Sequence, residues 1–244
     1  MLLNCDLGES YGAWTMGQDT KAMAHIDQAN IACGFHAGDP VVIQNTLALA
    51  KAHGVMVGAH PAYPDLVGFG RRSLNCSGAE LQALLHYQIA ALDGMAKAQG
   101  LHLAYVKPHG ALYNDMMTKP DILARVMEAI ASYPLPLRLM LQATGQWLEH
   151  QAAADQLGLK LYFEAFADRA YEDDGRLVAR SKPGAVHDHK GMLEQVKQLL
   201  NKGTITSING KVLELKVDSL CVHGDNDAGI AAIHEIRALL EQSS

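Results

Sequence analysis

The sequence lacks any concentration of positive charge. It has 20 Lys and Arg residues against 26 Asp and Glu residues, with a formal net charge of −6 and a pI near 6.0. Proteins that bind nucleic acids need a basic stripe to displace counterions from phosphate groups. The composition therefore argues against a nucleic-acid partner.

Long apolar runs are also missing. No stretch of 18 apolar residues occurs, which argues against a membrane span. Residues 1–6 (MLLNCD) place an acid where a signal peptide needs a basic and then a long apolar segment. The four cysteines form no C-x-x-C pair, and three of them lie in apolar stretches, as reduced buried thiols do. We therefore expect a cytoplasmic protein.

Two common nucleotide-binding loops are absent. No G-x-x-x-x-G-K-[ST] motif occurs, and no G-x-G-x-x-G follows an apolar strand. If the protein uses ATP, residues outside these two motifs must bind the nucleotide.

Short apolar runs alternate with longer amphipathic ones, the pattern of parallel strands joined by helices. Strands are predicted at 2–6, 28–33, 55–59, 102–107, 137–142, 160–164 and 219–223. Helices are predicted at 40–53, 78–99, 120–132, 145–156, 189–202 and 226–241. With 49% apolar and 19% charged residues, the chain can bury a large core. About seven β/α repeats in 244 residues predict one domain, 1–244, a TIM-like seven-stranded β/α barrel.

Two of the predicted helices have clear end signals. Asp39 is placed to cap the helix that begins at Pro40, and Gly54 follows its end. Ser77 and Glu80 form a capping-box pattern at the start of the next helix, 78–99.

Two segments do not fit the alternation of strands and helices. In 203–217, Asn209-Gly210 between alternating apolar positions predicts a type I′ hairpin that leaves the barrel. Segment 165–188 is rich in Asp, Arg and Gly and is too long for an ordinary connection. We expect it to cover an active site.

Polar side chains follow six of the seven predicted strands. The carboxyl ends of the strands converge on one face of a parallel β/α barrel, so these side chains should meet. The candidates, in strand order, are Asn4, Asp6 and Glu9; His36; His60; Lys107 and His109; Glu164, Asp168 and Arg169; and His223 and Asp225. His36, His60, His109 and His223 each follow an apolar strand beside a Gly or Pro, which indicates a shared site.

This set of groups suits general acid–base chemistry on an amide, with a cation to stabilise the oxyanion. Two other interpretations stay open. Asp6, His36 and His60 could bind a divalent metal, although no H-E-x-x-H spacing is present. Alternatively, Lys107, Arg169 and the histidines could hold an anionic ligand without chemistry. In "GFGRRS" (68–73), Arg71 or Arg72 contacts a phosphate or carboxylate, or the segment is a solvated turn.

Six blocks of the sequence resemble one known family in order and nearly end to end. They are LNCDLGES (3–10), ANIACGFHAGDP (29–40), GAHPAYPDLVGFGRR (58–72), VKPHGALYN (106–114), EAFADRAYEDDGRLVARSKPGAV (164–186) and CVHGD (221–225). The chain is similar to the LamB/YcsF family, assigned as the A subunit of bacterial ATP-dependent 5-oxoprolinase. One departure is Asn226-Asp227, where the family commonly has a small residue and proline.

The resemblance implies a seven-stranded barrel related to those of glycoside hydrolases and polysaccharide deacetylases. It also implies opening of 5-oxo-L-proline to L-glutamate, with ATP as co-substrate and with subunits B and C as partners. On this basis Asp6 and His109 are expected as acid–base partners, Lys107 as an oxyanion or phosphate stabiliser, and Asp168 as an orienting group or second base. The expected substrate-binding residues are Asn4, Glu9, His36, His60, Arg71, Tyr113, Glu164, Arg169, His223 and Asp225, with Tyr113 in the loop after His109.

Three functions therefore stay open. The first is a lactam-hydrolysing subunit that needs its partners and ATP. The second is a stand-alone, metal-dependent deacetylase that needs no nucleotide. The third is a non-catalytic subunit that binds a small ligand.

Overall fold

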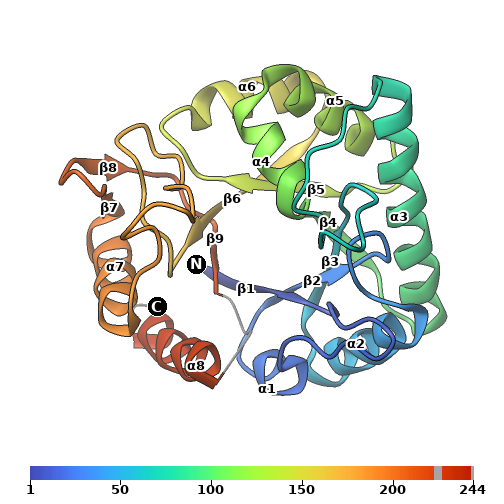
Figure 1. Ribbon diagram of the computed structural model, residues 1–244, viewed down its shortest axis with the longest axis horizontal. Helices are drawn as coiled ribbons and strands as arrows, with labels where there is room; N and C mark the ends of the chain where they lie inside the picture. Colours follow the sequence, from blue (N-terminus) through green and yellow to red (C-terminus); the bar gives the residue numbers. More distant parts are fainter. Residues whose placement is uncertain (223–226, 243–244) are drawn as a thin grey trace.

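The computed structural model describes residues 1–222 and 227–242. Seven parallel strands close into a barrel in the order β1-β2-β3-β4-β5-β6-β9, with helices around it (Figure 1). The strands are β1 (Leu2–Leu7), β2 (Gln28–Ala32), β3 (Met56–His60), β4 (Leu103–Val106), β5 (Arg138–Gln142), β6 (Lys160–Phe166) and β9 (Ser219–Cys221). The predicted seven-stranded barrel is confirmed.

The helices follow the prediction with two additions. They are α1 (Asp19–Met23), α2 (Pro40–His53), α3 (Gly78–Ala98), α4 (Gly110–Thr118), α5 (Pro120–Ala131), α6 (Trp147–Gln156), α7 (His189–Lys202) and α8 (Asp227–Gln242). The sequence pattern missed α1 and α4 because both are short. Tyr113 therefore lies on helix α4, and its placement in a loop was wrong.

The predicted helix starts have the expected hydrogen bonds. The Asp39 carboxylate accepts from the backbone N–H groups of Val41 and Val42 at 2.8 and 3.0 Å. Ser77 and Glu80 form the reciprocal capping box at the start of α3. These contacts fix where α2 and α3 begin, and so how they follow the strands before them.

A network of hydrogen-bonded polar side chains lies inside the barrel. The Ser219 hydroxyl donates to Gln28 Oε1 at 2.7 Å and accepts from Asn4 Nδ2 at 2.8 Å. Asn30 Nδ2 donates to Asn4 Oδ1 at 2.8 Å, and the Tyr105 hydroxyl donates to Asn30 Oδ1 at 2.6 Å. The interior of a β/α barrel usually holds branched apolar side chains. Here five buried polar side chains satisfy one another and support the groups above them.

The excursion near 203–217 forms a two-stranded antiparallel sheet, β7 (Thr204–Thr206) and β8 (Val212–Glu214). Its turn is not type I′, which needs positive φ at both central residues, because Gly210 has φ +88 and Asn209 has no positive φ. Ser207 N donates to Lys211 O, and Gly210 N donates to Ser207 O, so a three-residue loop with a left-handed glycine joins the strands. The assignment of 1–244 to one domain stays a prediction.

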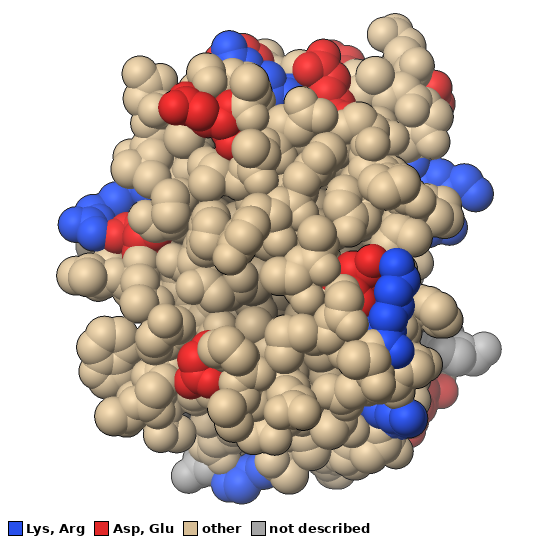
Figure 2. All heavy atoms as spheres, turned by 90° about the vertical axis from the view of Figure 1, so that its right-hand side faces the viewer, with Lys and Arg blue, Asp and Glu red and all other residues tan. Residues whose placement is uncertain are grey.

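The outer surface is sparsely charged where α3 faces outward. Figure 2 shows small separate groups of Lys, Arg, Asp and Glu on this face, with uncharged surface between them. Among the described residues, no helix combines the length and the apolar character needed to cross a membrane.

Gly58 in β3 makes room for the ring of Tyr105, since a Cβ at this position would lie 2.3 Å from two ring atoms. We predict that Gly58→Ala lowers the free energy of unfolding by about 3 kcal/mol, because the ring cannot move away in a packed interior. Gly94 lies at an exposed position of α3, where a Cβ meets no atom within 4 Å. Gly94→Ala should therefore raise the free energy of unfolding by about 0.5–1 kcal/mol. Urea unfolding of both variants measures the difference. Equal stability of the two would contradict the packing described.

Candidate active site

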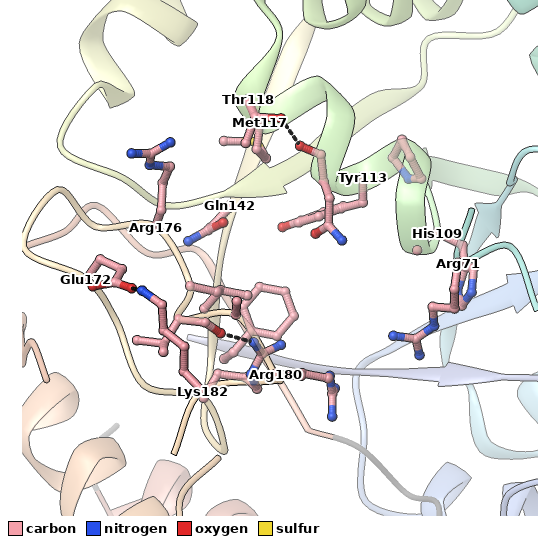
Figure 3. A pocket seen from close by; sticks show the side chains of 18 of the residues that line it. Arg71, His109, Tyr113, Met117, Thr118, Gln142, Glu172, Arg176, Arg180 and Lys182 are labelled. Carbon is pink, nitrogen blue, oxygen red and sulfur yellow. Dashed lines mark hydrogen bonds and ion pairs between the residues drawn. The ribbon is translucent and has the colours of Figure 1, made fainter. Parts of the chain in front are cut away.

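A cavity of about 880 Å³ opens at the carboxyl ends of the strands. Asp6, His60, Lys107 and His109 line it on the barrel side. Among the described residues that line it, 24 in number, eleven belong to segment 165–188, which the sequence predicts to be a cover. In Figure 3, Arg71 and His109 lie on one side of the open centre, and Arg180 and Lys182 lie toward the cover side.

Lys107 is the most connected group at the base of this cavity. Its Nζ lies 2.9 Å from Asp6 Oδ1 and 2.7 Å from Glu164 Oε1, and its side chain is 3% exposed. Burial opposes the charge, but the neighbouring Asp6 and Glu164 outweigh it and hold the pKa of Lys107 well above its ordinary value. Asn4 Oδ1 and Cys221 Sγ, each at 3.3 Å, complete the surroundings. Lys107 is therefore an ammonium ion with protein acceptors for all its hydrogens.

Asp6 is the carboxylate of this group that reaches the cavity. Its side chain is 16% exposed, whereas that of Glu164 is fully buried. Asp6 Oδ1 accepts from Lys107 and also from Asn30 Nδ2 at 2.8 Å. The other oxygen, Oδ2, lies 3.4 Å from His60 Nε2. One face of Asp6 is thus fixed by the barrel, and the other faces the histidines.

Glu164 is held from the opposite side by Tyr113. The Tyr113 hydroxyl donates to Glu164 Oε2 at 2.9 Å. Burial, together with the carboxylate of Glu164, raises the pKa of Tyr113 well above its ordinary value, so the phenol keeps its proton. Helix α4 is in this way tied to β6.

His60 and His109 form a second group beside Asp6. His60 Nδ1 donates to the backbone carbonyl of Lys107 at 2.6 Å, and His109 Nε2 donates to the carbonyl of Phe69 at 3.0 Å. The remaining nitrogens, His60 Nε2 and His109 Nδ1, lie 3.0 Å apart. Burial, and then His36 and His60, lower the pKa of His109 well below its ordinary value. His109 is therefore a neutral imidazole near neutral pH.

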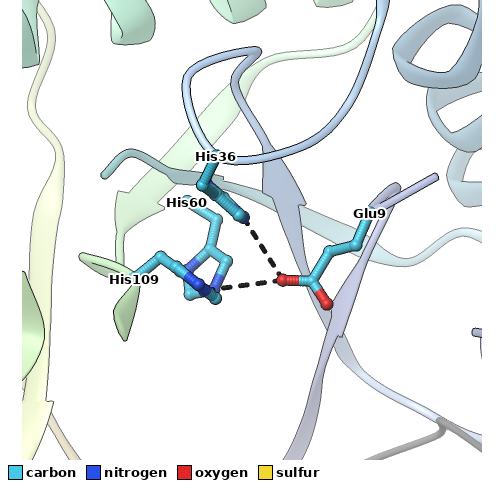
Figure 4. A group of neighbouring side chains, drawn as sticks. All are labelled: Glu9, His36, His60 and His109. Atoms are coloured by element: carbon cyan, nitrogen blue, oxygen red, sulfur yellow. Dashed lines mark hydrogen bonds and ion pairs between the residues drawn. The ribbon is translucent and has the colours of Figure 1, made fainter. Parts of the chain in front are cut away.

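Glu9 and His36 complete the histidine group (Figure 4). The ring of His36 stacks on that of His109 with centroids 3.8 Å apart and planes 5° apart. Glu9 Oε1 lies 3.3 Å from His36 Nε2 and 3.4 Å from His109 Nδ1. Burial, and then Asp6, raise the pKa of Glu9, and burial lowers the pKa of His36 well below its ordinary value.

The loops behind these side chains are held tightly. Asp19 accepts from the backbone N–H of Gly8 at 2.8 Å, which fixes the chain that carries Glu9. Phe69, whose carbonyl accepts from His109, has φ +53, an uncommon conformation for a residue with a side chain. Gly70 follows in a conformation where a Cβ would lie 2.9 Å from His109 Cδ2. Such backbone strain is found where a site must be held in one geometry.

The structure distinguishes the two arginines of 68–73. Arg71 lines the cavity, with its guanidinium 5.5 Å from the centre of the Phe69 ring. Arg72 forms an ion pair with Asp65 and is not among the lining residues. Arg71 is therefore the one placed to meet a ligand.

Backbone contacts hold the cover in place. Arg169 lines the cavity but donates to the carbonyls of Val178 and Ala185 at 2.6 and 3.3 Å. Gln195 Nε2 donates to three carbonyls at the start of the cover, those of Phe166, Ala167 and Arg169. Gln142 Nε2 donates to Gly175 O at 2.8 Å. Arg169 thus helps to hold segment 165–188, and its binding of an anionic group stays a prediction.

The remaining expected residues are distributed around the cavity. Tyr113 lines it, whereas Asn4 and Glu164 lie beneath it and Glu9 and His36 lie beside it. Asp168 is not among the lining residues, and its backbone carbonyl accepts from His187 N at 2.8 Å. His223, Asp225 and the departure at Asn226 lie outside the described residues.

Several residues that build the site were not predicted from the sequence. Asn30 lies in the middle of a predicted strand, and period-two alternation with Gln28 could have shown that both face the interior. Gln142 ends β5 and satisfies the same strand-end criterion as the chosen residues. Gln195 and the Phe69 carbonyl give no sequence signal, because their roles depend on distant backbone groups.

A metal ion fits the histidine group better than the set expected from sequence. Glu9, His36, His60 and His109 each offer a ligand atom, and these atoms all lie within 4.8 Å of one another. Imidazole nitrogens with one carboxylate are ligands that Zn²⁺ and related ions prefer. Asp6, which the sequence left open as a metal ligand, accepts hydrogen bonds from Lys107 and Asn30 through Oδ1, and its Oδ2 lies 3.4 Å from His60 Nε2.

Comparisons with known proteins agree with this architecture. The chain is 55% identical over 242 residues to the second 5-oxoprolinase A subunit of Pseudomonas putida, covering 99% of this chain and 94% of that protein. It is 48% identical over 241 residues to the 5-oxoprolinase A subunit of Vibrio cholerae, covering 98% and 97%. The crystal structure of a lactam utilization protein from Thermus thermophilus superposes with a TM-score of 0.91 at 38% identity, covering 100% of this chain and 96% of that one. The LamB/YcsF family model matches residues 1–244, so this chain belongs to the LamB/YcsF family.

Proposed function

We propose that this chain is the lactam-hydrolysing subunit of a 5-oxoprolinase, which opens 5-oxo-L-proline to L-glutamate with hydrolysis of ATP. The observation that carries the proposal is the similarity to relatives named as 5-oxoprolinase A subunits over nearly their whole length. The relative from Thermus thermophilus is named a lactam utilization protein, which supports the same class of substrate. Because the relatives are named as one subunit of an enzyme, we expect partners, which we take to be subunits B and C.

The cavity base has the groups that hydrolysis of a cyclic amide needs. A base must take a proton from water, and an acid must protonate the leaving nitrogen. Asp6 and His109 both line the cavity, and the neutral ring of His109 has its Nδ1 lone pair on the side of Glu9 and His60. In this proposal Asp6 and His109 share the proton transfers. Asp168 as a second base stays a prediction.

Lys107 acts through Asp6 in this proposal. Its Nζ already lies close to four acceptors, on Asp6, Glu164, Asn4 and Cys221, which is more than its three hydrogens can serve, so a substrate oxyanion would have to displace one of them. A nearby positive charge favours the ionised form of a carboxylate. We therefore assign Lys107 the positioning of Asp6 as a carboxylate, rather than the oxyanion contact expected from sequence.

The upper cavity has room and charge for the acidic parts of a ligand. A volume of about 880 Å³ exceeds what a small lactam fills, and Arg71 and Arg180 both line it. An arginine binds a carboxylate or a phosphoryl group through paired hydrogen bonds. Because the sequence has neither common nucleotide-binding loop, we assign ATP binding to the assembled complex.

We expect glutamate release from 5-oxoproline only when this chain is combined with subunits B and C and with ATP. An unstrained amide resists attack by water, so activation of its carbonyl must come first. The measurement is a glutamate assay on the purified chain alone, on the three subunits, and on the three subunits without ATP. Turnover of 5-oxoproline or of an acetylated sugar by the chain alone would contradict the proposal, and turnover of the sugar would favour a stand-alone hydrolase.

Asp6→Asn should lower kcat of the assembled enzyme about 10²–10⁴-fold, as loss of a general base does. The substitution keeps the size of the side chain, and Lys107 retains Glu164 as partner, so the fold should persist. Circular dichroism checks the fold. Asp155→Asn on the exposed surface of α6 is the matched control and should leave kcat unchanged. Equal kcat for the two variants would remove Asp6 from the chemistry.

Arg71→Gln should raise KM for 5-oxoproline about tenfold, since a hydrogen bond to a charged group contributes roughly 1.5–3 kcal/mol. The exposed guanidinium has no ion-pair partner among the described residues, so stability should not change. Arg125→Gln on α5, away from the cavity, is the control. An unchanged KM for Arg71→Gln would place the substrate carboxylate elsewhere.

A further inference from the structure

The histidine group contains an unresolved hydrogen-bonding problem. His60 Nδ1 and His109 Nε2 both face backbone carbonyls, at 2.6 and 3.0 Å, and a carbonyl can only accept. Both nitrogens must therefore carry hydrogens. In neutral rings, His60 Nε2 and His109 Nδ1 are then two lone pairs, and they lie 3.0 Å apart. Two lone pairs at this distance repel unless a cation lies between them.

Glu9 and His36 bring more electron pairs to the same point. Glu9 Oε1 lies 3.4 Å from His109 Nδ1 and 3.3 Å from His36 Nε2. The other nitrogen of His36, Nδ1, is buried with no hydrogen-bond partner among the described residues, so no contact there fixes the tautomer of this ring. His36 is free to present its Nε2 lone pair to the group.

A single proton would not satisfy this arrangement. A proton shared by His60 and His109 lies on the line between two nitrogens and leaves the contacts of Glu9 and His36 unexplained. A metal ion accepts the lone pairs of His60 and His109 and an oxygen of Glu9 at once. The ring of His36, which here lies parallel to that of His109, completes the set when it turns its Nε2 toward the ion. With metal–nitrogen bonds of about 2.0–2.1 Å, the ligand atoms of a tetrahedral site lie about 3.4 Å apart. Three separations here are 3.0, 3.3 and 3.4 Å, and none of the others exceeds 4.8 Å.

The surroundings of the group also match a metal centre. Histidine ligands commonly donate their second nitrogen to a backbone carbonyl, which fixes the tautomer and aims the ring. His60 and His109 both do so. The strained backbone at Phe69 sets the position of one of these carbonyls. All three histidines are at most 3% exposed, so the ligands are shielded from water.

We propose that Glu9, His36, His60 and His109 bind one divalent transition-metal ion, with Zn²⁺ the best match to three imidazoles and a carboxylate. Asp6 lies beside this centre and belongs to the Lys107 group. In the metal-bound protein His109 is a ligand, and Asp6 carries the proton transfers without it. The site is defined by its donors alone, so the proposal stands independently of which amide or other substrate the cavity accepts.

The test measures metal binding by the untagged chain without any substrate. Protein stripped with a chelator and dialysed is titrated with ZnCl₂ or MgCl₂ in a calorimeter, and the metal content is measured by mass spectrometry. We expect one Zn²⁺ per chain with micromolar or tighter affinity and no detectable Mg²⁺ binding. Saturating Zn²⁺ should raise Tm by about 5 °C, because the ion binds only the folded state. Co²⁺ should give the visible absorption bands of a tetrahedral site.

Variants assign the ligands. His60→Gln should weaken Zn²⁺ binding at least about 100-fold, and Glu9→Gln about tenfold or more, with His53→Gln on the exposed end of α2 as the matched control. Wild-type protein that binds clearly less than one Zn²⁺ per chain would overturn the proposal. So would binding that is equal in His60→Gln, Glu9→Gln and the control. If His60→Gln does not fold, the wild-type stoichiometry and the Glu9→Gln affinity decide. A failed glutamate assay would leave these results untouched.

Discussion

The ammonium of Lys107 holds the carboxylates of Asp6 and Glu164 together inside the barrel, where none of the three has much contact with water. Taking charges out of water is costly, and the cost is recovered only with close partners and further hydrogen bonds. Here Asn30 and Tyr113 supply those bonds to the two carboxylates, and Asn4 adds an acceptor for the lysine. The charged group therefore ties together β1, β4, β6 and helix α4. It also determines which carboxylate reaches the cavity, since only Asp6 is partly exposed.

The site is built in layers along the barrel axis. Buried amides and hydroxyls at the level of Asn4 and Asn30 satisfy one another and give the charged layer a rigid base. The charged layer in turn positions Asp6 beside His60, which belongs to the histidine group. Above both lies segment 165–188, braced by the β7–β8 hairpin through Ile208 N, which donates to Tyr171 O at 2.8 Å. Groups on strand ends supported from below keep the fixed geometry that catalysis needs.

Much of this arrangement was predictable, because a closed parallel barrel gathers its strand ends whatever the details of packing. The strand pattern alone placed Asp6, His60, Lys107 and His109 together, and the cap signals located α2 and α3. Individual contacts were not predictable. The two adjacent arginines at 71 and 72 look alike in sequence, yet Asp65 forms an ion pair with Arg72 and not with Arg71. The bonds of Arg169 to the carbonyls of Val178 and Ala185 have no sequence signal. The Asn209-Gly210 turn was assigned the wrong type, since loop length depends on strand register.

The central claim is that the buried charges of Lys107, Asp6 and Glu164 form one energetic unit on which the site rests. A double-mutant cycle on the free energy of unfolding tests it, with Lys107→Met and Glu164→Gln made singly and together. The account predicts that Lys107→Met alone costs about 3–5 kcal/mol, because it leaves two buried carboxylates without their cation. Adding Glu164→Gln should recover part of that loss, a coupling of more than about 1 kcal/mol. A Lys107→Met protein within about 0.5 kcal/mol of the wild type, or two strictly additive effects, would contradict the account.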